Sequence, residues 1–444
     1  MKKIIYFLAG WLACTPGLLK AQDKTDTILQ SATLNDCVSY ALKHQPSVQQ
    51  FRIDEEITEN NIRNRLADWY PQVSLAYSLQ HNIQLPTAFL PDANGNKRPV
   101  TTGVKNTSNV QFNLSQNIFN RDVLLATRSA ESVREQSRQL STGNRIDVAV
   151  AVSKAYYDLL VTQQQVKVFD ENIVRLERSL KDAYDKYEGG IADKIDYKRA
   201  QIALNTTRAD RKKAFDAIEG KRAYLKELMG YPAANPLSVL YDSMQMERDV
   251  PVDTLVDVQI TNRIEYRELL TQQRLLQYNL RYTRWSYLPS VSAIGSYNPT
   301  FQNDRFTSLY GSVYPSSFVG LQLTLPLFQG GKRLHNIRIA ELQLDRLQLQ
   351  VTALTDQINT QYAQALAGYK GNLAELIAIR DNLALAEDVY TTLRLQYNAG
   401  IKTYLDVIIA ETDLRTAQLS YLNALYQVLS SKLDLQRATG TISY

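Results

Sequence analysis

The chain has 444 residues, and its 50 Lys and Arg residues against 45 Asp and Glu residues give a formal net charge of +5. Removal of residues 1–21, which carry Lys2, Lys3 and Lys20 and no acidic residue, lowers that charge to +2. A charge so close to balance argues against a nucleic acid partner. The two cysteines are Cys14 and Cys37, and loss of the leader leaves Cys37 alone, so no disulfide is expected within the mature chain.

Residues 1–21 have the pattern of a secretory signal peptide. Two lysines precede an apolar run from Ile4 to Ala13, and Ala21 provides a small residue at the end. Lipidation of Cys14 as the first residue of a lipoprotein remains an alternative, although Trp11 fits poorly at its position before that cysteine. No later segment has about 18 to 20 consecutive apolar residues, so we expect any membrane-spanning part of the mature chain to be β.

Four segments alternate apolar and polar side chains with the period of a strand. They are residues 72–82, 109–119, 289–299 and 317–327. Each has about 11 residues, the length of a tilted strand that crosses a bilayer. Polar connections rich in Gly, Pro and Asn separate the members of each pair, which predicts two hairpins. An alternative places the apolar faces inside a sandwich that lies outside the membrane.

The rest of the chain is predicted to be helical. Residues 120–188 and 330–399 contain no proline, and about 70 residues of helix extend for roughly 100 Å. In the second rod Ile337, Leu344 and Val351 recur every seven residues, which predicts supercoiling against a neighbour.

Shorter helices are expected to flank each rod. Residues 193–229 and 403–438 would return along one half of the rods, and 34–70 and 255–288 would cover the other half. We expect the short helices to meet in a belt at residues 231–256, where prolines forbid a continuous helix.

The chain repeats itself once, at a spacing of about 210 residues. The landmarks are Phe119 with Phe328, Gly190-Ile191 with Gly400-Ile401, Asp196 with Asp406, and Gly230 with Gly440. So long a period indicates duplication of a domain-sized unit.

The expected divisions are a signal peptide (1–21), an N-terminal segment with the first helices (22–71), a first hairpin (72–119), a first helical hairpin (120–230), an equatorial segment (231–256), a helix of the second repeat (257–288), a second hairpin (289–328) and a second helical hairpin with the C-terminus (329–444).

Three segments resemble a known family in their order and spacing. They are 34–46 (LNDCVSYALKHQP), 187–196 (YEGGIADKID) and 397–407 (YNAGIKTYLDV). Together they resemble the outer membrane efflux family typified by TolC, over about residues 34–440. The resemblance implies a mainly α fold with a small transmembrane β part: a duplicated long α-helical coiled-coil barrel, with four strands per protomer that close a 12-strand β-barrel as a trimer. Independently, four strands leave two open edges that cannot face lipid, so closure between chains is expected.

The same resemblance implies a location and partners. It places the chain in the outer membrane of a Gram-negative bacterium, in contact with lipid and extending into the periplasm. It implies a homotrimer, a periplasmic adaptor protein and an inner-membrane pump of the RND, ABC or MFS type, with no cofactor.

The resemblance also implies an aperture gate made of Asp196, Tyr397, Lys402 and Asp406. Three symmetry-related Asp406 carboxylates would repel one another, favour bound cations and raise the pKa of the group. The family often has a second acid where this chain has Ile409, and arginine where it has Lys402. Only the second tip carries Tyr397 and Lys402, so the gate is expected there. The alternative is ordinary helix surface, with Asp406 as a first-turn acid favoured by the helix dipole.

Adaptor docking is implied at the helix tips, at Gly189, Gly190, Gly400 and Ile401. These glycines are also typical of left-handed helix ends, and the two roles are compatible.

The expected function is therefore a trimeric outer membrane channel-tunnel that exports small molecules, such as drugs and toxic compounds, or proteins from a tripartite pump. The alternatives are a type I protein-secretion duct and, from a different class, a secreted coiled-coil adhesin or scaffold. An enzyme is not expected, because His44, His81 and His335 lie in separate segments without a second ligand at metal spacing or a nucleophile motif.

Overall fold

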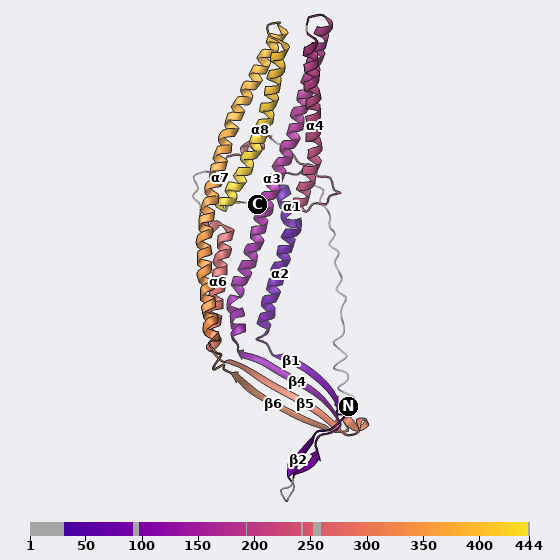
Figure 1. The fold of residues 1–444 in the computed structure, drawn as a ribbon, viewed down its shortest axis with the longest axis vertical. Coiled ribbons are helices and arrows are strands. Elements are labelled where there is room, and N and C mark those ends of the chain that lie inside the picture. Colours follow the sequence, from indigo (N-terminus) through magenta and orange to yellow (C-terminus); the bar gives the residue numbers. More distant parts are fainter. Residues whose placement is uncertain (1–30, 92–96, 192, 241–242, 252–258, 443–444) are drawn as a thin grey trace.

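Figure 1 shows a long molecule with helices over most of its length and a sheet at one end. The structure is a computed structural model that describes residues 31–91, 97–191, 193–240, 243–251 and 259–442. The expected signal peptide and Cys14 lie outside these residues, as does part of the expected equatorial segment.

The sheet has four antiparallel strands in the order β1-β4-β5-β6. Their bounds are Gln72–His81 (β1), Asn106–Phe119 (β4), Ser290–Asn303 (β5) and Val313–Thr324 (β6). The two hairpins join through β4 and β5, where Phe112 pairs with Tyr297. The outer strands β1 and β6 each have one unpaired edge within the chain.

Apolar side chains on the outer strands β1 and β6 of this sheet are largely exposed. Val73, Val319 and Leu321 are 72%, 90% and 74% exposed. The described residues contain no second sheet packed against this one, so the sandwich alternative is wrong.

Two local features of the strands differ from expectation. β6 ends at Thr324 rather than continuing to Leu327, and Pro326, which lacks an amide hydrogen, follows within the unpaired stretch. The first polar connection contains a small hairpin, β2 (Thr87–Pro91) with β3 (Lys97–Thr101). Its Phe89 and Val100 are types favoured in strands, but they lie too close to turn residues for the alternation to stand out.

The two rods are α3 (Arg121–Glu188) and α7 (Lys332–Asn398), of 68 and 67 residues. The predicted seam of α7 is its least exposed side: Ala340, Leu347 and Ile358 are buried, and Ile337 and Leu344 are half-buried.

The returning helices are α4 (Lys194–Met229) and α8 (Tyr404–Thr439), each of 36 residues. In Figure 1 they lie along the halves of α3 and α7 that are distant from the sheet. The other halves are covered by α2 (Pro46–Ala67), which follows α1 (Leu34–His44), and by α6 (Ile264–Arg284).

The α6 helix is shorter than expected. It has 21 residues, whereas a helix of about 35 residues was predicted from residue 255. The backbone of Arg263 is extended, and a short 3₁₀ turn at Ile260–Asn262 precedes it, so α-helical geometry begins only at Ile264. Residues 252–258 lie outside the described ranges.

Ion pairs between neighbouring helices establish the order α2-α3-α6-α7 in the half of the molecule near the sheet. The pairs are Glu59 with Arg134 (2.6 Å), Glu135 with Arg274 (2.5 Å) and Glu341 with Arg284 (3.2 Å).

The short helices meet near the middle of the rods, at two equivalent glycines. Gly230 and Gly440 follow α4 and α8 in left-handed conformations, with φ of 64° and 70°. A Cβ atom on Gly230 would lie 2.7 Å from the carbonyl oxygen of His44, and one on Gly440 would lie 2.9 Å from that of Asn262. Each glycine therefore permits a helix end to approach the backbone that precedes α2 or α6.

The largest buried cluster lies at this same level and joins both repeats. Cys37 from α1, Tyr156 from α3, Tyr369 from α7 and Leu425 from α8 belong to it. The hydroxyl of Tyr369 donates to the carbonyl oxygen of Val250, 2.8 Å away, in the segment that contains α5 (Ser243–Arg248). The belt is thus the part of the chain with the most developed core.

Candidate functional site

The two helix tips have the same backbone construction. Gly190 and Gly400 are left-handed, with φ of 72° and 76°. The Ile191 amide donates to the carbonyl oxygen of Lys186 and the Ile401 amide donates to that of Gln396, each at 2.9 Å. These bonds satisfy carbonyls that the helix ends leave free, so the glycines have the helix-terminating role expected of them.

The tips are open around these glycines. A Cβ atom on Gly190 or Gly400 would meet nothing within 4 Å. Ile191 and Ile401 are 81% and 71% exposed. Gly189 precedes the first of these turns with an ordinary right-handed backbone, as Ala399 does in the second.

Asp406 forms a capping box at the start of α8. Its Oδ2 accepts hydrogen bonds from the Thr403 amide (3.0 Å) and the Thr403 hydroxyl (2.7 Å). These bonds hold the pKa of Asp406 below its ordinary value, with a smaller contribution from Lys402. Within one chain the carboxylate is therefore part of a capping box whose N-cap is Thr403, and its pKa is shifted opposite to the direction expected for three converging acids.

Asp196 occupies the matching place in the first repeat but has a different environment. The cap of α4 is Asp193, whose side chain accepts from the Ile195 amide. In the described residues the structure gives no hydrogen bond or ion pair to the Asp196 carboxylate. The two repeated aspartates are therefore not equivalent.

Tyr397 joins the two tips. Its ring lies 5.8 Å from that of Tyr404, and the ammonium group of Lys186 in the first tip lies 3.7 Å from its centre. Tyr404 in turn packs against Ala183 and Ala200 of the first helical hairpin. This apolar and cation–π contact connects the repeats at the level where the gate was expected.

Lys402 is exposed, and the structure gives it no ion pair with a described residue. The expected set of Asp196, Tyr397 and Lys402 thus lies at the two tips without direct bonds among its members inside one chain.

Two further structural features concern membrane-spanning helices and metal sites. None of the helices in the described ranges has the length and apolar content needed to cross a membrane. Among the described residues, no group of three or more His, Cys, Asp or Glu side chains is placed to hold a metal ion.

A sequence profile of the family described as Outer membrane efflux protein matches residues 37–231 and 257–441. The chain belongs to this family. The match divides at the equatorial segment, so each of the two matched regions corresponds to one repeat.

Relatives of this chain include two outer membrane proteins and a secretion protein. Outer membrane protein TolC of Vibrio cholerae is 22% identical over 336 residues, covering 75% of this chain and 76% of the relative. Outer membrane protein TolC of Escherichia coli is 19% identical over 458 residues and covers 100% and 87%. Proteases secretion protein PrtF of Dickeya chrysanthemi is 22% identical over 310 residues and covers 67% and 65%.

Solved structures share the fold. CusC matches with a TM-score of 0.74 at 17% identity over 93% of both chains. VceC of Vibrio cholerae matches with a TM-score of 0.71 at 16% identity, covering 92% of this chain and 96% of that one. The fold class predicted from the sequence, a TolC-like α-helical protein with a small β part, is confirmed.

As a member of the outer membrane efflux family, this chain is an outer membrane channel protein for efflux or secretion. The family consists of channels rather than enzymes. The secreted adhesin or scaffold alternative is therefore wrong.

Beyond the expected residues, the structure reveals a buried carboxylate below the tips. Glu411 of α8 is 3% exposed, and the Nε of Arg175 on α3 lies 3.8 Å from its Oε1. Neither carboxylate oxygen has a hydrogen-bond partner in the described residues. Burial raises the pKa of Glu411 to about 7, although Arg175, Arg394 and Arg415 act in the opposite direction.

A signal for Glu411 was present in the sequence. It lies four residues after Val407 and three before Leu414, both buried, so it occupies an apolar stripe of α8. A charged residue in such a stripe indicates burial. Its approach to α3, however, depends on tertiary packing.

Proposed function

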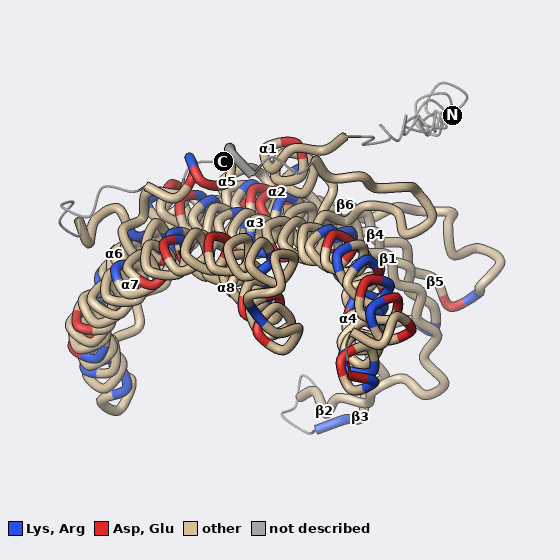
Figure 2. Tube along the Cα trace, turned by 90° about the horizontal axis from the view of Figure 1, so that it is seen from above, with Lys and Arg blue, Asp and Glu red and all other residues tan. Residues whose placement is uncertain are grey.

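We propose that three copies of this chain close a continuous tube that carries small molecules or proteins out of the cell. The observation that carries this proposal is that a single chain neither closes a ring of helices nor pairs both edges of its sheet. Seen from above in Figure 2, the helices form a curved row rather than a closed ring. At the other end β1 and β6 leave unpaired edges beside apolar faces that are exposed.

Closure between copies would satisfy both surfaces. Unpaired backbone groups cannot face lipid, because no water is present there to accept or donate hydrogen bonds. Pairing β6 of one copy with β1 of the next would remove every edge. Three copies would give a 12-strand barrel continued by a helical tunnel, in agreement with the family resemblance.

The tunnel would receive its cargo from other proteins. We propose a periplasmic adaptor that contacts Gly189, Gly190, Gly400 and Ile401, and an inner-membrane pump of the RND, ABC or MFS type. The open space around Gly190 and Gly400 and the exposure of Ile401 support contact at the tips.

The second tip would contain the gate. Asp406, Tyr397 and Lys402 lie within one turn region there, and Asp196 is on the adjacent hairpin. The exposed Lys402 is available to an acceptor on a neighbouring copy. Lysine makes a weaker and less directional pair than arginine, so the closed state would be held loosely.

Planar bilayer recordings test this function. The purified protein should conduct ions in discrete steps, and Lys402→Ala should raise the conductance because a bond that holds the aperture closed is removed. Lys194→Ala is the matched control, since Lys194 is an exposed lysine in the first turn of α4. If Lys402→Ala has the same resting conductance as the wild type, the proposed gate is wrong. If the reconstituted protein does not conduct ions, the proposed channel is wrong.

A type I secretion duct is the second candidate, favoured by the similarity to a protein named as a proteases secretion protein. Disruption of the gene separates the two functions. Loss of a protein from the culture medium would favour secretion, whereas increased sensitivity to toxic compounds with unchanged secreted protein would favour small-molecule efflux.

A further inference from the structure

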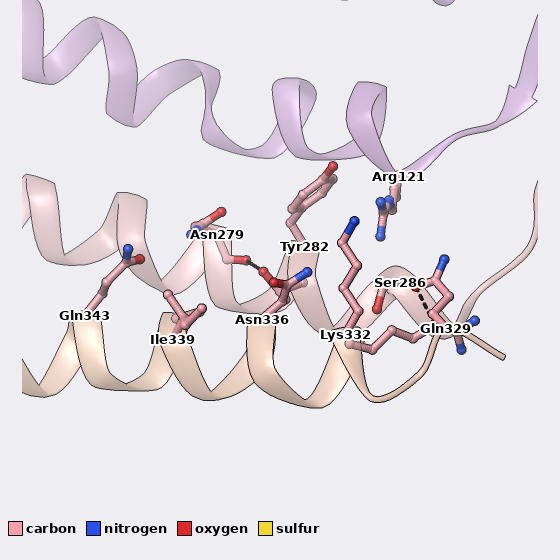
Figure 3. A pocket seen from close by; sticks show the side chains of 12 residues that line it. Arg121, Asn279, Tyr282, Ser286, Gln329, Lys332, Asn336, Ile339 and Gln343 are labelled. Atoms are coloured by element: carbon pink, nitrogen blue, oxygen red, sulfur yellow. Dashed lines mark hydrogen bonds between the residues drawn. The ribbon is translucent and has the colours of Figure 1, made fainter. Parts of the chain in front are cut away.

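A pocket of about 460 Å³ lies where the helices meet the sheet. Its walls come from the first turn of α3, the last turns of α6 and the first turns of α7 (Figure 3). It is distant from the tips and has no part in the proposed gate.

The lining of this pocket is strongly basic. Arg121, Lys332 and Arg333 line it, and none of its 12 lining residues is acidic. Amides and hydroxyls supply most of the remaining surface. In Figure 3, Arg121 and Lys332 extend from different helices into the same space. Like charges that converge in a concave site favour an anion between them.

These three cations have no carboxylate partner in the part of the chain that the structure describes. In the described residues the structure gives no ion pair to Arg121, Lys332 or Arg333. Asp122, the acid beside Arg121, accepts a hydrogen bond from the Tyr282 hydroxyl at 2.6 Å and does not line the pocket. Glu341 pairs instead with Arg284 and Arg338, at 3.2 Å and 3.5 Å.

Polar atoms in the pocket region also lack partners. Nη2 of Arg333 and Oγ of Ser286 are buried without a hydrogen bond in the described residues. Arg333 is fixed by its other contacts: its Nε donates to Oε1 of Gln329 at 3.3 Å, and its guanidinium carbon lies 5.0 Å from the centre of the Tyr287 ring. A buried donor without an acceptor is costly, and a bound oxyanion would supply the acceptor.

The start of α7 also favours a bound anion. Its N-cap is Gly331, which has no side chain to cap the helix, and the first turn contains no acid. Lys332 and Arg333 instead place two positive charges at the positive end of the helix dipole, an arrangement that is unfavourable without an anion. Free backbone amides at a helix start are themselves suited to an oxyanion.

We propose that this pocket binds a phosphate-type oxyanion, with Arg121, Lys332 and Arg333 as its ligands. Arginine matches the geometry of phosphate oxygens, and lysine adds a mobile point charge. The pocket lies directly beside the strands, and the exposed Leu327 and Phe328 precede α7. The phosphate can therefore belong to a phospholipid headgroup at the membrane surface or to a free anion.

Calorimetric titration of the detergent-purified protein tests the site, with dihexanoyl phosphatidylglycerol and inorganic phosphate as separate probes at constant ionic strength. At least one probe should bind saturably, and the double variant Lys332→Gln/Arg333→Gln should weaken binding by about tenfold or more. The control variant Arg284→Gln/Arg338→Gln makes the same change of charge on α6 and α7 outside the pocket and should bind as the wild type does.

Each outcome has a distinct meaning. Binding of phosphatidylglycerol alone would identify a lipid headgroup site, and equal binding of both probes would identify a site for free anions. Absence of saturable binding in the millimolar range, or equal weakening in both double variants, would overturn the proposal.

A second measurement uses only the wild-type protein, so it does not require that a variant folds. At least one of the two probes, inorganic phosphate or dihexanoyl phosphatidylglycerol, should raise the Tm of the wild-type protein above its value in sodium chloride of equal ionic strength, because a ligand that binds only the folded state stabilises it. A Tm that neither probe changes would contradict the site.

Discussion

At the scale of single residues, Asp406 and Asp36 form the same contact in different places. In both capping boxes the carboxylate accepts from a threonine amide at 3.0 Å and from the threonine hydroxyl at 2.7 Å. The pKa of each aspartate is lowered by these bonds. Asp36 lies in the first turn of α1 near the belt, whereas Asp406 lies at the tip. Variants of the two residues can therefore distinguish a capping role from a role at the aperture.

Asp406→Asn should weaken the block of single channels by polyvalent cations, because three carboxylates would be removed from the proposed aperture. The expected effect is about a tenfold rise in the half-blocking concentration of hexamminecobalt(III), measured in planar bilayers. Asp36→Asn loses an equivalent cap and should keep the wild-type block. Equal block in Asp406→Asn and the wild type would rule out the carboxylate ring.

Glu411 makes the stability of the wild-type protein depend on pH. Its pKa is raised to about 7 in the folded state from an ordinary value of 4.5. The folded state therefore binds the proton more tightly than the unfolded state does. Stability from this group is fully present below pH 4.5 and is lost as the pH rises toward 7.

Glu411→Gln should remove this dependence, because glutamine stays neutral. The wild type should lose at most about 3 kcal/mol per chain between pH 4.5 and pH 8 from this group, measured as a fall in Tm that is smaller in the variant. Glu375→Gln, an exposed position on α7, is the control and should retain the wild-type pH dependence. Parallel Tm curves for Glu411→Gln and the wild type would contradict the assignment.

At the scale of elements, four glycines end four helices with the same left-handed turn but in two environments. Gly190 and Gly400 face open space at the tips, whereas Gly230 and Gly440 lie against the backbone of the belt. A side chain at any of them adds conformational strain, but only at the belt does it also collide with a carbonyl group.

Gly400→Val should therefore leave assembly intact and lower export by a reconstituted tripartite pump. The left-handed backbone costs roughly 1 to 2 kcal/mol for a residue other than glycine, which the long helices can tolerate. Gly440→Val should cost more and reduce the yield of assembled protein, because its Cβ would lie 2.9 Å from the Asn262 oxygen. Assembly is measured by size-exclusion chromatography in detergent. Normal export by Gly400→Val would remove the docking role of the second tip.

Much of the element layout follows from local rules. The long runs without proline, the seam through Leu347 and Ile358 and the glycine ends are decided within a few residues of the chain, and they predict α3, α7 and both tips. The start of α6 was missed because it depends on the extended backbone at Arg263. The hydrogen bond from Arg263 to the Ala438 carbonyl oxygen, at 3.1 Å, joins positions 175 residues apart.

The candidate site was predictable to a smaller degree. The repeat paired Asp196 with Asp406, and the family resemblance placed Tyr397 and Lys402 at the second tip. Repetition alone, however, could not show that the carboxylate of Asp406 bonds to Thr403 in a capping box, whereas that of Asp196 has no such bond in the described residues. The contact of Lys186 with Tyr397 and the burial of Glu411 against α3 arise from packing between the repeats, which no local pattern contains.

At the scale of the whole molecule, the chain buries a core at the belt. At the sheet it exposes an apolar face and two unpaired strand edges, and its helices form an open row. Few globular proteins expose so continuous an apolar surface as that of Val319, Leu321 and Leu323, which are 90%, 74% and 65% exposed. Lipid against this face and further copies against the edges of β1 and β6 would account for both features. The curved row of helices in Figure 2 requires the same partners to become a tube.

Single-particle electron microscopy of the protein in lipid nanodiscs tests this account most directly. We predict particles with threefold symmetry in which twelve strands close one barrel, continued by a helical tunnel that narrows at the tips. Particles that contain a single chain, or assemblies in which β1 and β6 remain unpaired and no central passage exists, would contradict the proposed channel.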